Sequence, residues 1–364
     1  MSEHFNGKEY ENYLNSLEKQ LNKPSVEESF NAQEIKTPAC KKQEKLKLRK
    51  STLTVLLCVA IVCASLLVTL PKRPEQDPSL SENVSQSDKK ATKKKVPSFA
   101  FNTKTLAIPD TNDAKTAIII NKSTGKVVAA RMPHLKTYAA STIKIMTLIV
   151  AVENIDDLSQ CFTMTYKITD PLFEAGASVA GFLNEETVTI TDLLYGLILP
   201  SGADAAMALA IKTAGSEEEF VKLMNKKAKK LGLHSTHFTN CTGLYDEDNY
   251  TSAYDMAIIL EYALQNKLCK KILTSYTYTT SKTPQHPEGI KLFATLFSHM
   301  YGTEPETATI LGGKTGFVNE SGYCIASFGK ANESKKEYII ITLGNSAKWP
   351  AFYGQIDLYK QFAK

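Results

Sequence analysis

Strand patterns stand at both ends of residues 99–364, and helical patterns fill the region between them. Near the N-terminal end, Thr116–Asn121 and Lys126–Arg131 are short apolar runs joined by a turn, which predicts two neighbouring strands. Later patterns predict strands at Ala308–Leu311, Tyr323–Phe328 and Tyr338–Leu343 and a terminal helix at Trp349–Phe362. Because strands must pair to bury an apolar face, we expect an α+β fold with one antiparallel sheet built from the N- and C-terminal strands. A helical subdomain, at about residues 140–275, is then inserted between the two groups of strands.

An uncharged stretch of twenty residues, 51–70, lies ahead of this domain. A helix of that length spans about 30 Å, which is the thickness of the hydrocarbon core of a bilayer. Lysine and arginine are denser before the stretch than after it, so we expect the preceding residues to stay in the cytoplasm. We therefore predict a single-pass protein of the cell membrane, with a cytoplasmic polar tail (1–50), a transmembrane anchor (51–70), a flexible tether (71–98) and an extracytoplasmic folded domain (99–364). A signal peptide cleaved near residues 62–64 is the alternative, but it would need an unusually long charged leader.

The remaining composition argues against several classes of partner. The net charge of +5 is modest, and nothing after residue 100 is strongly basic or interleaves basic with aromatic residues, so we expect no nucleic-acid partner. The seven cysteines form no Cys-x-x-Cys pair and are interpreted as buried apolar residues, although one bridge among the four after residue 100 stays open. His234 and His237 lack the spacing and the glutamate of a helical zinc site, so we expect no metal and no cofactor.

Ser141 and Lys144 open an otherwise apolar helical run that continues to Val152. Residues three apart lie on the same face of a helix, so the lysine amine can reach the serine hydroxyl and take its proton. A lysine among apolar side chains loses hydration, which lowers its pKa and favours the neutral amine that a base must be. A pair on a solvated helix face is the weaker interpretation, because the surrounding segment is apolar.

Two further motifs follow in the chain, a Ser-Gly-Ala at 201–203 and a Lys-Thr-Gly at 314–316. Ser-x-x-Lys, Ser-Asp-Asn and Lys-Thr-Gly are together the signature of penicillin-binding proteins and related β-lactamases. The connecting segments match as well: Asn121–Val128, Pro200–Ala206, Asn240–Leu244 and Tyr250–Ala257. Over about residues 100–345 the chain resembles the low-molecular-mass D-alanyl-D-alanine carboxypeptidases, a branch of the penicillin-binding proteins.

Acyl transfer needs a nucleophile, a base, a proton relay to the leaving amine, and donors for the oxyanion. We assign the nucleophile to Ser141, the general base to Lys144, and the proton relay to Ser201, which stands at a tight turn between two helical segments. Lys314 would add positive charge near Ser201 and near a substrate carboxylate, which Thr315 can hydrogen-bond from an edge strand. The predicted substrate-binding residues are Lys314, Thr315, Gly316 and Phe317.

The resemblance implies the two-part fold of serine β-lactamases and penicillin-binding proteins, with an oxyanion hole formed by the backbone N–H groups of Ser141 and Phe317. It also implies that residues 99–364 are the catalytic domain of a serine D,D-carboxypeptidase, which the predicted anchor at residues 51–70 would hold on the membrane. Such an enzyme removes the terminal D-alanine from peptidoglycan pentapeptides that end in D-Ala-D-Ala, through an acyl-enzyme on Ser141. Because penicillin mimics that end, β-lactam antibiotics should acylate the same serine and act as inhibitors.

Ala203 departs from the family pattern, because the second motif usually ends in asparagine and alanine offers no side-chain hydrogen bond. Losing one orienting contact lowers a rate by about ten- to a thousandfold without removing the nucleophile. Two alternatives therefore stand beside the carboxypeptidase: a class A-like β-lactamase, and a catalytically impaired muropeptide- and penicillin-binding protein. Class A enzymes carry a glutamate loop that positions water, and we find no such loop between Lys144 and Ser201.

Overall fold

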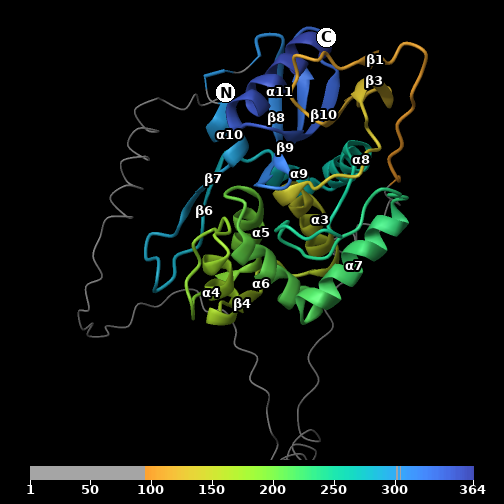
Figure 1. Ribbon diagram of the computed structural model, residues 1–364. Helices are drawn as coiled ribbons and strands as arrows, with labels where there is room; N and C mark the ends of the chain where they lie inside the picture. The colour runs from red at the N-terminus through yellow and green to blue at the C-terminus, as the bar shows by residue number, and fades with distance from the viewer. Residues whose placement is uncertain (1–94, 301, 304) are drawn as a thin grey trace, which may run out of the picture. The chain divides into compact units, whose positions relative to one another are not determined.

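The computed structural model describes residues 95–364 except 301 and 304, and a six-stranded sheet forms its upper part in Figure 1. The strands are β1 (Leu106–Ala107), β2 (Thr116–Asn121), β3 (Lys126–Arg131), β8 (Ala308–Val318), β9 (Gly322–Ala331) and β10 (Glu337–Asn345), in the spatial order β1-β3-β2-β10-β9-β8. β2 pairs antiparallel with β10, with Ile119 opposite Ile340, so strands from both ends of the domain lie side by side. The predicted α+β fold is confirmed, although the short β1 pairs parallel with β3.

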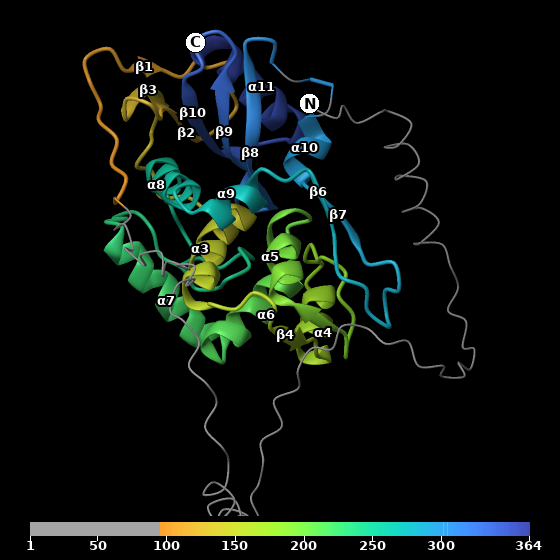
Figure 2. The same ribbon diagram turned by 180° about the vertical axis from the view of Figure 1, so that it is seen from behind.

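Alternating side chains of the strands divide the core into two parts. In β2, Ile118 and Ile120 pack into the cluster shared with the helical subdomain, while Ile119 packs into the cluster on the opposite face. This period of two, apolar on both sides, is typical of a strand that is buried on both faces. Figures 1 and 2 show the covering helices, which are α10 (Thr295–Met300) and α11 (Lys348–Phe362) on one face and α8 (Ala253–Leu264) on the other.

The helical subdomain is inserted between β3 and β8 and is built around α3. Besides α3 and α8, the helices of this subdomain are α4 (Tyr166–Glu174), α5 (Ile190–Ile198), α6 (Ala203–Ala214), α7 (Glu217–Lys230) and α9 (Lys267–Leu273). In α3 (Lys144–Asn154) every side chain up to Ala151 is buried, which explains why the sequence shows a continuous apolar run there. Ser216 and Ser252 begin α7 and α8 as N-caps, each accepting a hydrogen bond from the third helical amide.

Two short strand pairs and one helix were not among the elements predicted from the sequence. β4 (Cys161–Thr163) pairs with β5 (Thr187–Thr189), and β6 (Thr277–Thr279) pairs with β7 (Lys291–Phe293). Strands of three residues hold too few alternations to produce a period-two signal. The helix α4 was not predicted either, because Pro171 lies inside it and normally argues against a helix.

The predicted tail, the predicted anchor and most of the predicted tether, residues 1–94, lie outside the described residues. Membrane anchoring therefore stays a prediction. Within residues 95–300, 302–303 and 305–364, no helix is long and apolar enough to cross a membrane. Cys241, Cys269 and Cys324 are buried, and no disulfide joins any two of these three residues.

Asp192 should be a stability determinant, because it ties the β6–β7 hairpin to the start of α5. Its carboxylate accepts hydrogen bonds from the Thr189 hydroxyl at 2.6 Å, the Tyr278 hydroxyl at 2.9 Å and the Ser281 amide at 3.0 Å. Asp192→Ala leaves these donors without their acceptor in a fully buried place, so the free energy of unfolding in urea should fall by about 3 kcal/mol. Asp357→Ala removes only an exposed ion pair of α11 and should change the free energy of unfolding by less than about 0.5 kcal/mol. Equal losses in the two variants would contradict the assignment.

Candidate active site

A cavity of about 600 Å³ lies where the edge strand β8 meets the helical subdomain. Of the predicted site residues, those that line it are Ser141, Lys144, Ser201, Thr315, Gly316 and Phe317. They belong to the turn before α3, the start of α3, the turn between α5 and α6, and β8. The fold therefore brings residues of all three motifs to one cavity, although the motifs are widely separated in the sequence.

Ser141 and Lys144 are in direct contact. The Lys144 ammonium nitrogen Nζ lies 2.8 Å from the Ser141 Oγ and donates a second hydrogen bond to the carbonyl oxygen of Thr242 at 2.6 Å. Ser141 lies in a short 3₁₀ turn, Ala140–Ile143, and α3 begins at Lys144. The offset of three residues thus places the Ser141 and Lys144 side chains on the same face, as the sequence predicts. The pair lies at the junction of a 3₁₀ turn and a helix, not within one continuous helix.

Burial sets the protonation of Lys144. Its side chain is 2% exposed, and this loss of hydration lowers the pKa of Lys144 to about 8. The negative charge of Asp204 opposes the shift, and so would a thiolate at Cys241. Burial raises the pKa of the Cys241 thiol well above its usual value, so the thiol is neutral near pH 8 and adds no charge. Asp204 is therefore the acidic neighbour whose negative charge raises the pKa of Lys144 and so partly offsets the effect of burial.

Two glycines fix the backbone around Ser141. Gly243 has a φ of +80°, and a Cβ there would lie 2.4 Å from the carbonyl oxygen of Ala140. A Cβ at Gly316 would lie 2.7 Å from the backbone nitrogen of Ser141. Ala140 has a φ of +46°, which is rare and costly for a residue other than glycine. The backbone of the Ser141 turn is thus held in an uncommon conformation between two segments that approach too closely for a side chain.

The Ser201 turn is also conformationally unusual. Ser201 has a φ of +69°, and a Cβ at Gly202 would lie 2.7 Å from the carbonyl oxygen of Gly196. The serine is 6% exposed and lines the cavity. Ala203, the position that departs from the family pattern, also lines the cavity and starts α6, where its methyl group offers no hydrogen bond.

Asp204 holds the loop beside this turn. Its carboxylate accepts hydrogen bonds from the backbone amides of Ala180 and Ala205 at 2.8 and 2.9 Å, and of Gly181 and Phe182 at 3.1 and 3.3 Å. Burial raises the pKa of Asp204, while these four donors favour the ionised form. The side chain therefore fixes one wall of the cavity rather than facing the nucleophile.

Lys314 lies behind the cavity wall. The side chain is 1% exposed, and its Nζ donates a hydrogen bond to the carbonyl oxygen of Thr315 at 2.7 Å. Burial and the nearby Lys144 lower the pKa of Lys314 well below its usual value. The hydroxyl of Thr315 lies 2.8 Å from the hydroxyl of Thr295, which starts α10. The sequence assigned to Lys314 a positive charge near a substrate carboxylate. In the structure, Lys314 is a buried amine with a lowered pKa.

A second lysine, Lys348 at the start of α11, lines the cavity on the Thr315 side. His299 lines the same wall, and its Nδ1 lies 2.7 Å from the carbonyl oxygen of Thr295. Burial lowers the pKa of His299, and the positive charge of Lys348 adds to this effect. Lys348 is half-buried and brings a positive charge to this wall, a role that the sequence did not predict.

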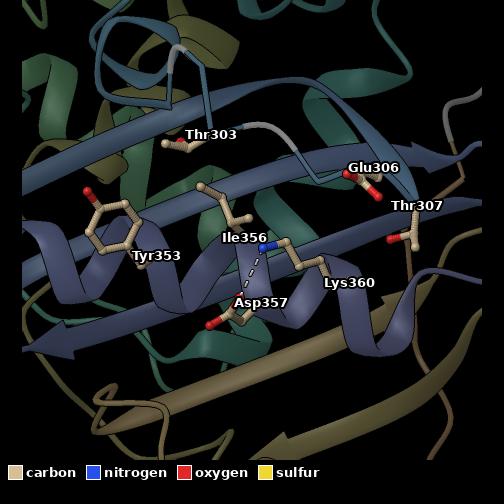
Figure 3. Close-up of a pocket in the computed structure, with 7 residues that line it drawn as sticks. All are labelled: Thr303, Glu306, Thr307, Tyr353, Ile356, Asp357 and Lys360. Atoms are coloured by element: carbon tan, nitrogen blue, oxygen red, sulfur yellow. Dashed lines mark ion pairs between the residues drawn. The ribbon is translucent and has the colours of Figure 1, made fainter.

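A second cavity, of about 630 Å³, lies along α11 and is not a candidate for acyl transfer (Figure 3). Tyr353, Ile356, Asp357 and Lys360 project into it from α11, opposite Thr303, Glu306 and Thr307. Figure 3 marks the Asp357–Lys360 ion pair of 3.5 Å on its floor. These lining residues hold no serine or cysteine beside a lysine or histidine, so the cavity offers no activated nucleophile.

The comparisons with known proteins agree with this geometry. Residues 102–347 match the D-alanyl-D-alanine carboxypeptidase family (peptidase S11). The chain belongs to this family. It is 34% identical over 236 residues to the D-alanyl-D-alanine carboxypeptidase DacF of Bacillus subtilis (strain 168), covering 65% of this chain and 58% of DacF. It is 31% identical to the D-alanyl-D-alanine carboxypeptidase of Streptomyces sp. (strain K15) over 57% of this chain and 72% of that protein.

Solved structures of related proteins share the fold. The crystal structure of the Streptomyces K15 DD-transpeptidase covers 68% of this chain and 97% of its own, with a TM-score of 0.61 and 27% identity. A putative penicillin-binding protein homologue, Rv2911 from Mycobacterium tuberculosis, gives a TM-score of 0.59 at 25% identity, covering 71% of this chain and 95% of its own. The fold of the described domain is therefore that of penicillin-binding DD-peptidases.

Some residues of the site had no role assigned from the sequence. The segment Asn240–Leu244 was noted for its family match, yet Thr242 and Gly243 contact Lys144 and the Ser141 turn through their backbone. A contact through a backbone carbonyl does not constrain the residue type, but a glycine inside a matched segment is a usable signal. Lys348 carried no such signal, because it lies well beyond the last motif and reaches the cavity only through the packing of α11 on the sheet.

Acylation of Ser141 should accelerate as the pH rises through about 8. The neutral amine of Lys144 is the form that can accept the serine proton, and its pKa is about 8 because burial disfavours the ammonium. The rate of labelling by a fluorescent penicillin, measured between about pH 6 and pH 10, should follow that titration and level off roughly one unit above the pKa. A rate that still rises at the alkaline end of this range would mean that the lysine is solvated and the assignment is wrong.

Gly243→Ala should remove activity while leaving the chain folded. A Cβ at 2.4 Å from the carbonyl oxygen of Ala140, at a φ of +80°, forces the Ser141 turn to move. We expect penicillin labelling to slow by at least about a hundredfold, since a displacement of about 1 Å has that effect on a catalytic geometry. Gly215→Ala is the matched control, because Gly215 also has a positive φ but a Cβ there would have no atom within 4 Å. Unchanged labelling in Gly243→Ala would contradict the role of this contact.

Proposed function

We propose that this chain is a membrane-anchored serine D,D-carboxypeptidase that removes the terminal D-alanine of peptidoglycan stem peptides ending in D-Ala-D-Ala. One observation carries the proposal: the Oγ of Ser141 lies 2.8 Å from the Nζ of a lysine that is 2% exposed. Membership of the D-alanyl-D-alanine carboxypeptidase family supports the substrate class. The matched part of DacF is 58% of that protein, so the full activity of such relatives is carried over here as a proposal.

The first step is proton transfer from Ser141 to the neutral amine of Lys144. The Oγ then attacks the carbonyl carbon of the penultimate D-alanine and forms a tetrahedral intermediate. Its oxyanion would accept hydrogen bonds from the backbone N–H groups of Ser141 and Phe317. Both groups are close to the point where Gly316 approaches the Ser141 nitrogen, so β8 and the nucleophile turn form one rigid unit.

The second step breaks the bond to the terminal D-alanine. The leaving amine takes a proton that Ser201 relays from Lys144, and the acyl group stays on Ser141 as an ester. Water then attacks the ester with Lys144 again as the base, which releases the shortened peptide. The turn at Ser201, with its φ of +69°, places this serine at the cavity wall and supports the relay role.

The terminal carboxylate would bind on the Thr315 side of the cavity. Thr315 offers a hydroxyl from the edge strand, and the half-buried Lys348 offers a positive charge on the same wall. Lys314 is fully buried and bonded to the carbonyl oxygen of Thr315, so it supports the strand from behind. A direct contact between Lys314 and the carboxylate stays a prediction.

β-Lactams would acylate Ser141 by the same route, because their strained amide takes the place of the scissile bond. The predicted anchor at residues 51–70 would hold the enzyme on the outer side of the cell membrane, within reach of nascent peptidoglycan. The uncharged sequence of this segment and the lysine-rich flank before it support that arrangement.

Ser141→Ala should abolish both D-alanine release from a pentapeptide and covalent labelling by a fluorescent penicillin. The variant keeps the cavity but removes the nucleophile, so we expect release to fall by at least about ten-thousandfold. Ser178→Ala, at another serine that lines the cavity, should keep both activities near the parent level. Labelling of Ser141→Ala at the parent rate would overturn the proposed mechanism.

One observation favours a second function, a muropeptide-binding protein with little catalysis. Ala203 is 2% exposed at the cavity and lacks the amide that the family motif supplies there. Measuring D-alanine release and peptide binding on the same preparation separates the two functions. Binding without release would favour the binder, whereas multiple turnovers favour the carboxypeptidase.

A further inference from the structure

One end of the cavity carries exposed aromatic rings. Phe317 and Tyr323 are stacked with their ring centroids 4.3 Å apart, and both line the cavity. Tyr245, which also lines it, meets Tyr138 edge to face at 5.0 Å. Phe317 and Tyr245 are 47% and 48% exposed, although large rings are normally covered. Both ring pairs thus offer apolar and π surface to whatever enters the cavity.

The same end is negatively charged. Glu320, in the turn between β8 and β9, lines the cavity and is exposed. A hydrogen bond with Tyr138 raises the pKa of Tyr245, and the charges of Glu320 and Glu247 add to the effect, so both carboxylates act on the Tyr245 hydroxyl. Within the described part of the chain, neither glutamate is within ion-pair distance of a lysine, arginine or histidine. Their charge is therefore left for a bound cation.

The order of residues along β8 tells which part of a substrate meets this end. Thr315 lies beside α10 and Lys348, Gly316 lies against the Ser141 backbone, and Phe317 leads to the turn that carries Glu320. β8 is the edge strand of the sheet, so an extended peptide can lie along it at about 3.3 Å per residue. With its scissile carbonyl at Ser141 and its terminal carboxylate toward Thr315, the peptide runs on toward Phe317. The residue that precedes the D-Ala-D-Ala pair then reaches the aromatic end.

We propose that the ring pairs Phe317–Tyr323 and Tyr138–Tyr245, together with Glu320, form a subsite that selects stem peptides whose third residue carries a free amine. The methylene groups of such a side chain pack on the rings, and the ammonium lies against their π faces and the Glu320 carboxylate. An acylated amine loses the charge and therefore both attractions. The proposal of this subsite rests on the proposed carboxypeptidase function and specifies which stem peptides that enzyme would prefer.

D-alanine release from two synthetic peptides tests the subsite on the full chain. Both end in Lys-D-Ala-D-Ala, and the lysine side chain is free in one peptide and N-acetylated in the other. The parent should cleave the free-amine peptide with about a 3- to 30-fold higher kcat/KM, the range expected of a cation held by aromatic rings and a carboxylate. Glu320→Gln should lower kcat/KM for the free-amine peptide at least about threefold and leave that for the acetylated peptide unchanged. Phe317→Leu, which keeps apolar volume but removes a ring, should also reduce the preference.

Glu333→Gln is the matched control, because Glu333 is an exposed glutamate in the next turn of the sheet and does not line the cavity. Equal cleavage of both peptides by the parent would overturn the subsite and leave the carboxypeptidase function standing. So would an equal loss on both peptides in Glu320→Gln. No release from either peptide by the parent would overturn the proposed function, and the subsite would fall with it.

Discussion

The site depends on keeping water away from one amine. The pKa of Lys144 is lowered because α3 is buried among α5, α6 and α8 over the whole of its first two turns, and the proposed role of this lysine as a base depends on that burial. The helical subdomain is therefore the part of the fold that excludes solvent from Lys144. The 3₁₀ turn ahead of α3 places the Ser141 hydroxyl within hydrogen-bond distance of the Lys144 amine. Asp204 limits the effect, because its negative charge stops the pKa from falling further. The chemistry follows from this balance between desolvation and one retained charge.

Buried carboxylates join separate segments of the helical subdomain and of the β6–β7 hairpin. Asp204 and Asp192 each accept several hydrogen bonds from loops or from the β6–β7 hairpin. Glu186 adds a third such centre, accepting from the Leu183 amide at 2.8 Å and the Thr283 hydroxyl at 2.7 Å. In each case one acidic side chain bonds groups that are distant from one another in the chain or in a loop. Asp204 does so for the loop beside the cavity.

The fold and the catalytic pair were largely predictable, and the reasons are local. Strands of six or more residues and a buried apolar helix give clear periodic signals, and the contact between Ser141 and Lys144 was predictable from their spacing together with the apolar segment around them. The burial of Lys314 and its bond to the carbonyl oxygen of Thr315 were not predictable, because a sequence does not tell which side of a strand a lysine occupies. Its role near a substrate carboxylate stays a prediction. Thr242, Thr295 and Lys348 were missed since they reach the site through backbone atoms or through packing between distant elements.

The pairing of β2 with β10 joins two segments that more than two hundred residues separate. Strand β8, which backs the nucleophile through Gly316, is also made late, far behind the turn that holds Ser141. Such long-range contacts form slowly, because the entropy of closing a large loop precedes any gain from pairing. A ribosome must therefore have synthesised β8 before this strand can pack against the Ser141 turn. Nascent fragments that stop short of β8 are expected to lack the assembled cavity.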